Sequence, residues 1–514
     1  PRKPHFVGTL RMQDGALRLE MTEDGEPAPE VVDILRALRD RKKYFRLKDG
    51  SFLDLSEMDE WREMAEAAVG GEMGEPEEEE KNLRGVVEVA SYRAAYMTSL
   101  LESGKIPVKA EDSVKNMVGS LQDDGEPCPE PLDQMLRPYQ MRGFMWMQAL
   151  DRLRMGGILA DDMGLGKTLQ MIAHILARVE AGDTKPTLVV CPASLVYNWT
   201  AELERFAPSL DVCAIVGAKA QRRVQIAGVA EHNVVVTSYD LMRRDIDEYV
   251  EQDFARVVLD EAQYIKNPLT QVARAAKRLP AGVRFALTGT PIENRLSELW
   301  SIFDFLMPGL LGTRDSFAKR FESPVEHAEG DSAARLQALV SPFVLRRVKE
   351  DVVADLPEKI EDTVMAQLTG EQRKLYLANQ DRIAQQVQHR ESSEFKKDKL
   401  KVLAELTKLR QICCDPRLHY EDYKAGSAKL DTCMELVHGA LDGGHRILLF
   451  SQFTGMLDII GKRLAKEDIA FLKLTGASSK ESRAKMVAQF QAGEVPVFLI
   501  SLKAGGVGLN LTAA

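Results

Sequence analysis

The chain has 514 residues, 45% of them hydrophobic, and carries 68 Lys and Arg against 78 Asp and Glu, a formal charge of -10. This composition excludes a disordered chain, and no apolar run approaches the ~18 residues of a membrane span. The length predicts roughly three to four domains, and the acidic balance disfavours a protein that binds polyanions over its whole surface but allows a local basic groove.

The first 125 residues predict an α+β accessory module. Two Asp-Gly pairs, at 14–15 and 49–50, each lie between short apolar runs, and Asp-Gly is a favoured hairpin turn because it tolerates positive φ. Apolar spacing predicts helices over 31–38, 61–68 and 83–101. Residues 72–80 include six Glu, which predicts a solvated linker. The alternative is an acidic segment that covers a basic groove.

From about residue 136, short apolar strands alternate with helical patterns, which is typical of a parallel α/β sheet. The predicted strands are 157–160, 187–191, 212–216, 233–237, 256–259 and 285–287. Residues 311–440 predict charged helices without strands, and strands return at 446–451, 470–474 and 497–501. We therefore divide the chain into an accessory module with its linker (1–125), a first α/β lobe (126–310), a helical inter-lobe region (311–440) and the start of a second lobe (441–514).

A glycine-rich turn joins the first strand of this lobe to a helix. Gly164 and Gly166 allow backbone N–H groups to face phosphate oxygens at the positive end of the helix that follows. Lys167 is placed to reach the β- and γ-phosphates, and the Thr168 hydroxyl to bind Mg²⁺. The generic phosphate-loop pattern has glycine where this chain has Asp161, so the match rests on the Gly-x-Gly-Lys-Thr end in its strand-to-helix context.

Two carboxylates, Asp260 and Glu261, end a strand about ninety residues after the phosphate loop. In that order they predict a hydrolase site in which Asp260 holds the Mg²⁺ shell and Glu261 orients and deprotonates the attacking water. Alone, such a pair is more often the N-cap of a helix.

Two further patterns gain meaning from this context. Thr288-Gly289-Thr290 follows a strand and is a candidate sensor of the γ-phosphate, although by itself it is an ordinary turn. Gln140 precedes the phosphate loop, and its amide can both donate to and accept from an adenine edge. Without that context, it would be interpreted as a surface residue.

This order of motifs resembles that of superfamily-two helicase-like ATPases, and the intervening residues narrow the resemblance to the bacterial branch of the Swi/Snf family of DNA-translocating ATPases. The segments that carry it are ADDMGLGKT (160–168), DEAQYIKN (260–267), LTGTPIEN (287–294), PFVLRR (342–347) and LLFSQF (448–453). The resemblance covers residues 136–514. It implies an α/β fold of two RecA-like P-loop lobes with ATP and Mg²⁺ in the cleft between them.

The resemblance also implies residues that contact DNA and residues that couple this contact to the nucleotide. The implied DNA contacts are Ser194, Thr237, Ser238, Ser451, Gln452, Thr475, Gly476, Gly505 and Gly506. The implied coupling residues are Thr288, Gly289, Thr290, Gly508 and Asn510. Contacts of this kind go to phosphates and carry no sequence information, so sequence-independent binding is expected.

The family's arginine-finger motif has no counterpart before Ala514. We therefore expect a second lobe cut at Ala514, and a chain whose ATP hydrolysis is impaired, because such a finger contributes roughly 10³- to 10⁵-fold in rate in related enzymes. Arg346 and Arg347 are candidate substitutes, and the alternative for them is a linker ion pair.

The leading hypothesis is a DNA-dependent ATPase that moves along double-stranded DNA and displaces or remodels bound protein, with RNA polymerase or another DNA-bound protein as its partner. The alternatives are a strand-separating DNA or RNA helicase, and a nucleic-acid-binding scaffold with a dormant ATPase. Six cysteines without metal spacing predict a reducing, cytosolic compartment. Together with the resemblance, this implies the bacterial cytoplasm and association with the nucleoid.

Overall fold

The computed structural model describes residues 1–13, 16–69, 85–89, 93–102, 106–119, 126–290, 295–323, 332–352, 361–368, 370–388, 399–505 and 511–514. The chain forms two compact units, Pro1–Leu356 and Pro357–Ala514, and each is described by itself. No described helix is long and apolar enough to cross a membrane.

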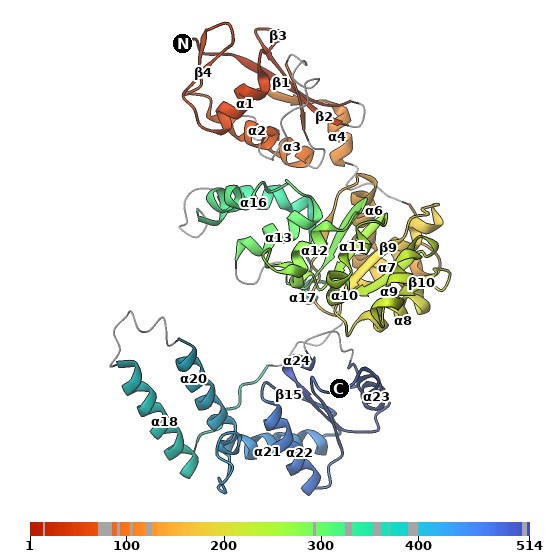
Figure 1. The fold of residues 1–514 in the computed structure, drawn as a ribbon, viewed down its shortest axis with the longest axis vertical. Helices are drawn as coiled ribbons and strands as arrows, with labels where there is room; N and C mark the ends of the chain where they lie inside the picture. Colours follow the sequence, from red (N-terminus) through yellow and green to blue (C-terminus); the bar gives the residue numbers. More distant parts are fainter. Residues whose placement is uncertain are drawn as a thin grey trace. The chain divides into compact units, whose positions relative to one another are not determined.

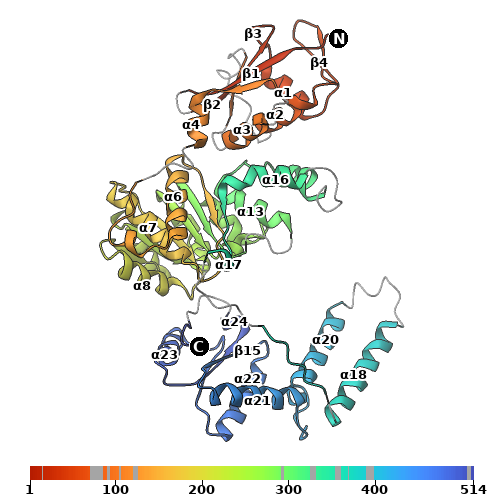
Figure 2. The same ribbon diagram turned by 180° about the vertical axis from the view of Figure 1, so that it is seen from behind.

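The accessory module is built on a five-stranded sheet in which β1 (Phe6–Gln13), β2 (Ala16–Glu23), β3 (Glu26–Pro27) and β7 (Val108–Ala110) follow the order β3-β2-β1-β7, and β6 (Val86–Val89) pairs with β2. Its helices are α1 (Val31–Arg39), α2 (Asp59–Val69), α3 (Ala94–Glu102) and α4 (Asp112–Gly119), and α1, α2 and α3 lie side by side in both views (Figures 1 and 2). One hydrophobic core joins the sheet to these helices, with Leu10, Leu35 and Met64 fully buried.

Both predicted hairpins have antiparallel strands. Between β4 (Tyr44–Arg46) and β5 (Phe52–Asp54), Gly50 has φ +87°, the left-handed conformation that favours glycine. In the first hairpin Gln13 pairs with Ala16, and the predicted turn at 14–15 lies outside the described residues, as does the predicted linker at 72–80. The prediction of one helix over 83–101 is wrong for β6, because residues 86–89 pair with β2 about 70 positions earlier, a contact that local spacing does not reveal.

A seven-stranded sheet forms the centre of the rest of the first unit, with the order β10-β11-β9-β12-β13-β8-β14 and parallel pairing throughout. Its strands are β8 (Gly157–Leu159), β9 (Thr187–Cys191), β10 (Val212–Ala214), β11 (Val234–Ser238), β12 (Arg256–Asp260), β13 (Val283–Leu287) and β14 (Val344–Leu345). Strands β9, β11 and β12 are buried at every position, as expected of parallel strands covered on both faces.

The longer helices of this region are α6 (Pro138–Arg152), α7 (Lys167–Glu180), α8 (Val196–Phe206), α9 (Lys219–Ala227), α12 (Gln271–Arg278), α13 (Leu296–Leu306) and α16 (Ser332–Val340). The shorter ones are α5 (Leu132–Met135), α10 (Tyr239–Arg244), α11 (Ile246–Tyr249), α14 (Arg314–Phe317), α17 (Lys349–Val352), η4 (Val229–Glu231), η5 (Ala262–Ile265), η6 (Ala318–Glu322) and η7 (Ser341–Phe343).

The prediction that 311–440 contains no strand is wrong at β14. Its two residues are too few to show an alternating pattern, and they are held by pairing with Ile158 and Leu159, far away in sequence. The other predicted strands are confirmed within one or two residues at most ends, and the predicted α/β class with parallel sheets is confirmed.

The second unit holds a parallel sheet of β15 (Ile447–Ser451), β16 (Phe471–Leu474) and β17 (Val497–Ser501) in the order β15-β17-β16. Its helices are α18 (Gly370–Gln388), α20 (Lys399–Cys414), η8 (Pro416–Leu418), α21 (Ala428–Asp442), α22 (Thr454–Lys466), α23 (Lys480–Gln491) and α24 (Leu502–Gly505). The buried Gln372 ties three of them together, because its amide donates to Ile412 O at 2.8 Å and accepts from Ala428 N at 3.0 Å.

Candidate active site

The predicted phosphate loop lies between β8 and α7, at the carboxyl edge of the seven-stranded sheet. Gly164 and Gly166 have φ of +85° and +76°, so both adopt the left-handed conformation. A Cβ on Gly166 would also lie 2.4 Å from Nε2 of Gln140. The loop therefore needs glycine at both positions, and its last glycine precedes the first turn of α7, where the helix dipole favours an anion.

Lys167 opens α7, and its ammonium lies among oxygen atoms. Its Nζ donates to Asp161 O at 2.7 Å and to Asp162 O at 3.3 Å. Burial lowers the pKa of Lys167 from its usual value, and the negative charges of Glu261 and Asp260 act in the opposite direction. This arrangement offers a partly desolvated cation to a phosphate next to two carboxylates.

Asp260, the last residue of β12, is held by two aromatic side chains. The indole Nε1 of Trp199 donates to its Oδ2 at 2.8 Å, and the hydroxyl of Tyr239 donates to its main-chain oxygen at 2.8 Å. Burial raises the pKa of Asp260 to about 6, and Glu261 acts in the same direction while the Trp199 hydrogen bond opposes it. A buried carboxylate so restrained is a fixed oxygen ligand for a hard cation.

Trp199 is 1% exposed, and no local pattern in the sequence shows its polar contact, because its partner Asp260 is 61 positions away. The only available signal was that a buried indole N–H requires an acceptor.

Glu261 directly follows β12 with φ +53°, a left-handed conformation that costs a non-glycine residue roughly 1–2 kcal/mol. The side chain amide of Gln263 donates to its Oε2 at 2.8 Å, and Gln263 Oε1 accepts from the Thr288 hydroxyl at 3.2 Å. That hydroxyl in turn accepts from Thr290 N at 3.2 Å. A chain of hydrogen bonds thus joins Glu261 to the predicted sensor at the end of β13, and sequence reasoning missed Gln263 as its central member.

Gln140 is buried, and both ends of its amide have protein partners. Oε1 accepts from Arg137 N at 2.9 Å, and Nε2 donates to Leu165 O at 3.0 Å. Here the side chain supports the phosphate loop, and its contact with adenine stays a prediction.

The donor set fits Mg²⁺, which binds proteins through one or two carboxylate or hydroxyl oxygens and completes its shell with phosphate and water. Asp260 and the half-buried Thr168 would hold it. Within the described residues no group of three or more His, Cys, Asp or Glu could hold a metal by itself.

The residues predicted to contact DNA in the first unit differ in exposure. Ser194 is exposed just before α8, whereas Thr237 and Ser238 end β11 as fully or nearly fully buried residues. Ser238 caps α10 by accepting from Leu241 N at 3.4 Å. Of these three residues only Ser194 is exposed, and the contact of all three with DNA stays a prediction.

In the second unit the predicted DNA contacts gather at one edge of the sheet. Ser451 ends β15, Thr475 follows β16, and Gly505 ends the short helix after β17, so all three lie at or beyond the carboxyl ends of parallel strands. Gln452 and Gly476 are exposed there, and Arg410 donates to Gln452 Oε1. The predicted residues Gly506, Gly508 and Asn510 lie outside the described residues.

The alternative interpretation of Arg347 as an ion-pair residue is confirmed. Its guanidinium binds both carboxylate oxygens of the fully buried Asp161, with Nε to Oδ1 at 2.8 Å. Arg346, by contrast, is exposed.

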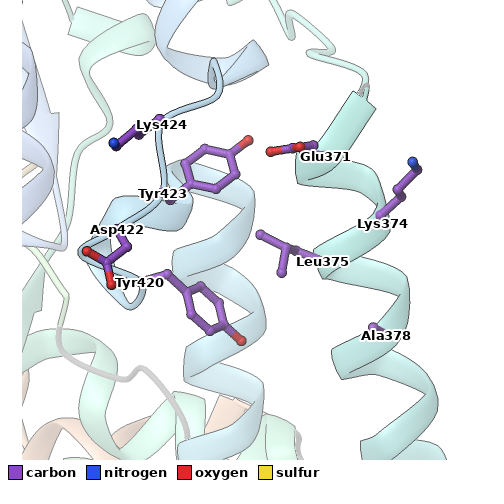
Figure 3. A pocket seen from close by; sticks show the side chains of 8 residues that line it. All are labelled: Glu371, Lys374, Leu375, Ala378, Tyr420, Asp422, Tyr423 and Lys424. Carbon is purple, nitrogen blue, oxygen red and sulfur yellow. The ribbon is translucent and has the colours of Figure 1, made fainter.

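A separate cavity of about 610 Å³ lies in the second unit between α18 and the loop before α21 (Figure 3). Two tyrosines, Tyr420 and Tyr423, line it together with residues of both charges, and none of the predicted site residues does.

Comparison with known proteins gives three matches along the chain. Residues 1–126 match the family described as bacterial SNF2 helicase associated, residues 139–418 the SNF2-related domain, and residues 428–514 the helicase conserved C-terminal domain. The predicted resemblance is thereby confirmed.

The chain is 40% identical over 392 residues to YwqA of Bacillus subtilis, whose name describes an ATP-dependent helicase/translocase, with 74% of this chain and 42% of the relative covered. It is 35% identical over 460 residues to the TATA-binding protein-associated factor mot1 of Schizosaccharomyces pombe, covering 75% of this chain and 24% of that one. The solved SWI2/SNF2 ATPase core of Sulfolobus solfataricus in complex with dsDNA is 36% identical, covers 77% of this chain and 82% of its own, and has a TM-score of 0.43. The chain thus spans less than half the length of these two curated relatives.

Proposed function

Because the chain belongs to the SNF2-related family, we propose that it is an ATP-driven motor that moves along double-stranded DNA and displaces or remodels protein bound there. The observation that carries the proposal is the position of Lys167 beside the carboxylates of Asp260 and Glu261, at the edge where parallel strands end. That edge is where open α/β sheets bind their ligands.

In the proposed reaction, Lys167 and the glycine-rich loop bind the triphosphate, and Asp260 with Thr168 holds the cation. Mg²⁺, when bound, neutralises charge that develops on the phosphate oxygens. Glu261 orients the attacking water and accepts its proton, and the hydrogen bonds through Gln263 and Thr288 hold Glu261 in position.

Glu261→Gln tests the proposed base. The amide keeps the shape of the side chain but cannot accept the proton, so ATP hydrolysis should be lost while ATP binding remains. Glu231→Gln, a change at an exposed position of the same unit, is the matched control. Unchanged turnover in Glu261→Gln removes the proposed base.

The nucleic-acid substrate is tested by comparing ATP turnover on duplex and single-stranded DNA of the same sequence, together with displacement of a bound triplex strand. Stimulation by duplex and triplex displacement without strand separation support the translocase. Stimulation by single strands with unwinding supports the helicase instead. The relative from Schizosaccharomyces pombe is named as a factor associated with the TATA-binding protein. That name supports a DNA-bound protein as the one that this chain displaces.

A further inference from the structure

The chain that leaves the first unit lies along the phosphate loop. Strand β14 pairs with β8, and the hydrogen bonds continue past both strands, from Ala160 N to Leu345 O at 2.7 Å and from Asp162 N to Arg347 O at 3.0 Å. Lys349 N then donates to Asp162 Oδ2 at 3.1 Å. This exit segment (residues 344–349) lies near the end of the first unit, which extends to Leu356.

Arg347 fixes the exit segment by side-chain contacts as well. Besides the two bonds to Asp161, its Nη2 donates to Gln170 Oε1 at 2.8 Å and its Nη1 donates to Tyr139 O. The guanidinium carbon also lies 5.3 Å from the centre of the Tyr139 ring. Four acceptors and a ring face match the planar fork of arginine, and the ammonium of lysine cannot reproduce them.

Gln170, on α7, carries this network into the phosphate loop. Its Nε2 donates to Asp161 Oδ2 at 3.2 Å and lies 3.3 Å from Gly166 O. Gly143 on α6 leaves room for these contacts, because a Cβ there would lie 2.0 Å from Gln170 Oε1 and 2.9 Å from Arg347 Nη2.

Asp161 and Asp162 each make one contact through the main-chain oxygen and another through the carboxylate. Through their main-chain oxygens both accept from Lys167 Nζ, and through their carboxylates they bind Arg347 and Lys349 N. A phosphate bound to Lys167 competes for the same ammonium hydrogens. Nucleotide binding therefore changes the hydrogen bonds of the two residues that hold the exit segment.

We infer that Asp161, Asp162 and Arg347 form a junction through which nucleotide at the phosphate loop repositions the exit segment. Arg347 is thus a positioning residue for the coupling of ATP to movement. The inference rests on the proposed function, because it requires a nucleotide at Lys167. Tightly packed buried groups have few alternative arrangements, so a small shift at Lys167 is passed on as a change of state.

The test is amide hydrogen exchange of the full chain, with and without a non-hydrolysable ATP analogue and Mg²⁺, read in a peptide that covers residues 343–350. Wild type, Arg347→Lys, Asp161→Asn and the control Arg346→Ala are compared, and the affinity for a fluorescent ATP analogue is measured for each. Thermal unfolding shows which variants are folded. Arg347→Lys and Asp161→Asn change opposite sides of the same ion pair, so the test can still be made if one of the two variants does not fold.

In wild type and Arg346→Ala, the nucleotide should change exchange in this peptide by roughly five- to a hundred-fold, the usual range of such couplings. In Arg347→Lys and Asp161→Asn, bound nucleotide should leave the rate of amide exchange in this peptide nearly unchanged. Nucleotide binding by wild type without a change at 343–350, or a full change in both junction variants, overturns this inference alone. Failure of wild type to bind nucleotide overturns the proposed function as well.

Discussion

Replacing Trp199 by Phe removes one hydrogen bond to Asp260 and keeps an aromatic ring in the core. The indole donates to Oδ2 at 2.8 Å from a side chain that is 1% exposed. A hydrogen bond to an ionised group contributes about 1.5–3 kcal/mol. Its loss disfavours the carboxylate and leaves the protonated acid unaffected, so the pKa of Asp260 must rise.

The size of this rise follows from the same numbers. In the wild type, burial raises the pKa of Asp260 to about 6 even with the indole bond in place. Since about 1.4 kcal/mol corresponds to one pH unit, Trp199→Phe moves the midpoint of ionisation upward by about one to two pH units. At pH 7 wild-type Asp260 is mostly ionised, and in the variant a large fraction is protonated.

Mg²⁺-dependent binding of a fluorescent ATP analogue between pH 5 and 8 measures the effect, because a metal ligand must be deprotonated. In wild type the apparent Mg²⁺ affinity should fall about tenfold per pH unit below about pH 6, and in Trp199→Phe the fall should begin one to two units higher. Tyr239→Phe is the matched control, because its hydroxyl donates to the main-chain oxygen of Asp260 and not to the carboxylate. Equal midpoints in Trp199→Phe and wild type, or equal movement in both variants, would refute the reasoning.

Three more predictions follow from the charged groups of the site. In the absence of Mg²⁺, Asp260→Asn should raise the free energy of unfolding by about 3 kcal/mol above pH 6 and change it little below pH 4. The reason is that the pKa of Asp260 is raised from 3.8 to about 6 in the folded state, so the wild type loses stability as pH rises through that window. Urea unfolding above pH 6 and below pH 4 checks this. Lys167→Ala should weaken ATP binding about a hundredfold through loss of a charge-assisted contact worth about 3 kcal/mol, measured by calorimetry, and unchanged affinity contradicts the phosphate role. Arg347→Ala should lower the free energy of unfolding by about 3–5 kcal/mol, because it leaves Asp161 buried without its partner. Arg346→Ala should change the free energy of unfolding by no more than about 0.5 kcal/mol. Equal losses for the two variants in urea unfolding would contradict the ion pair assigned to Arg347.

The parts of the fold that the sequence predicts well are those whose signal is local. Strands β9 and β12 are covered on both faces, so each forms a continuous apolar run whose ends are visible in the sequence. Strand β6 was predicted as helix and β14 was not predicted, because both are short and depend on a partner strand far away in the chain. Pairing of that kind leaves no periodic pattern.

The same limit applies to the candidate site. The residues that touch nucleotide or metal in the proposal, among them Lys167 and Asp260, belong to motifs a few residues long and can be recognised without a structure. Trp199 and Gln263 position these residues by single hydrogen bonds across the sheet edge, and only the fold brings them there. Burial adds a further effect, because the raised pKa of Asp260 depends on how completely the surrounding elements exclude water.

Asp161 shows how a departure from a motif acquires a physical reason. The generic phosphate loop has glycine at this position. Here the side chain is fully buried and bound at both oxygens by a guanidinium that lies 186 positions later in the chain. A carboxylate without that partner would be strongly destabilising in the same place, so Asp161 and Arg347 have to be present together, and the shape of the phosphate loop depends on the segment that leads out of the first unit.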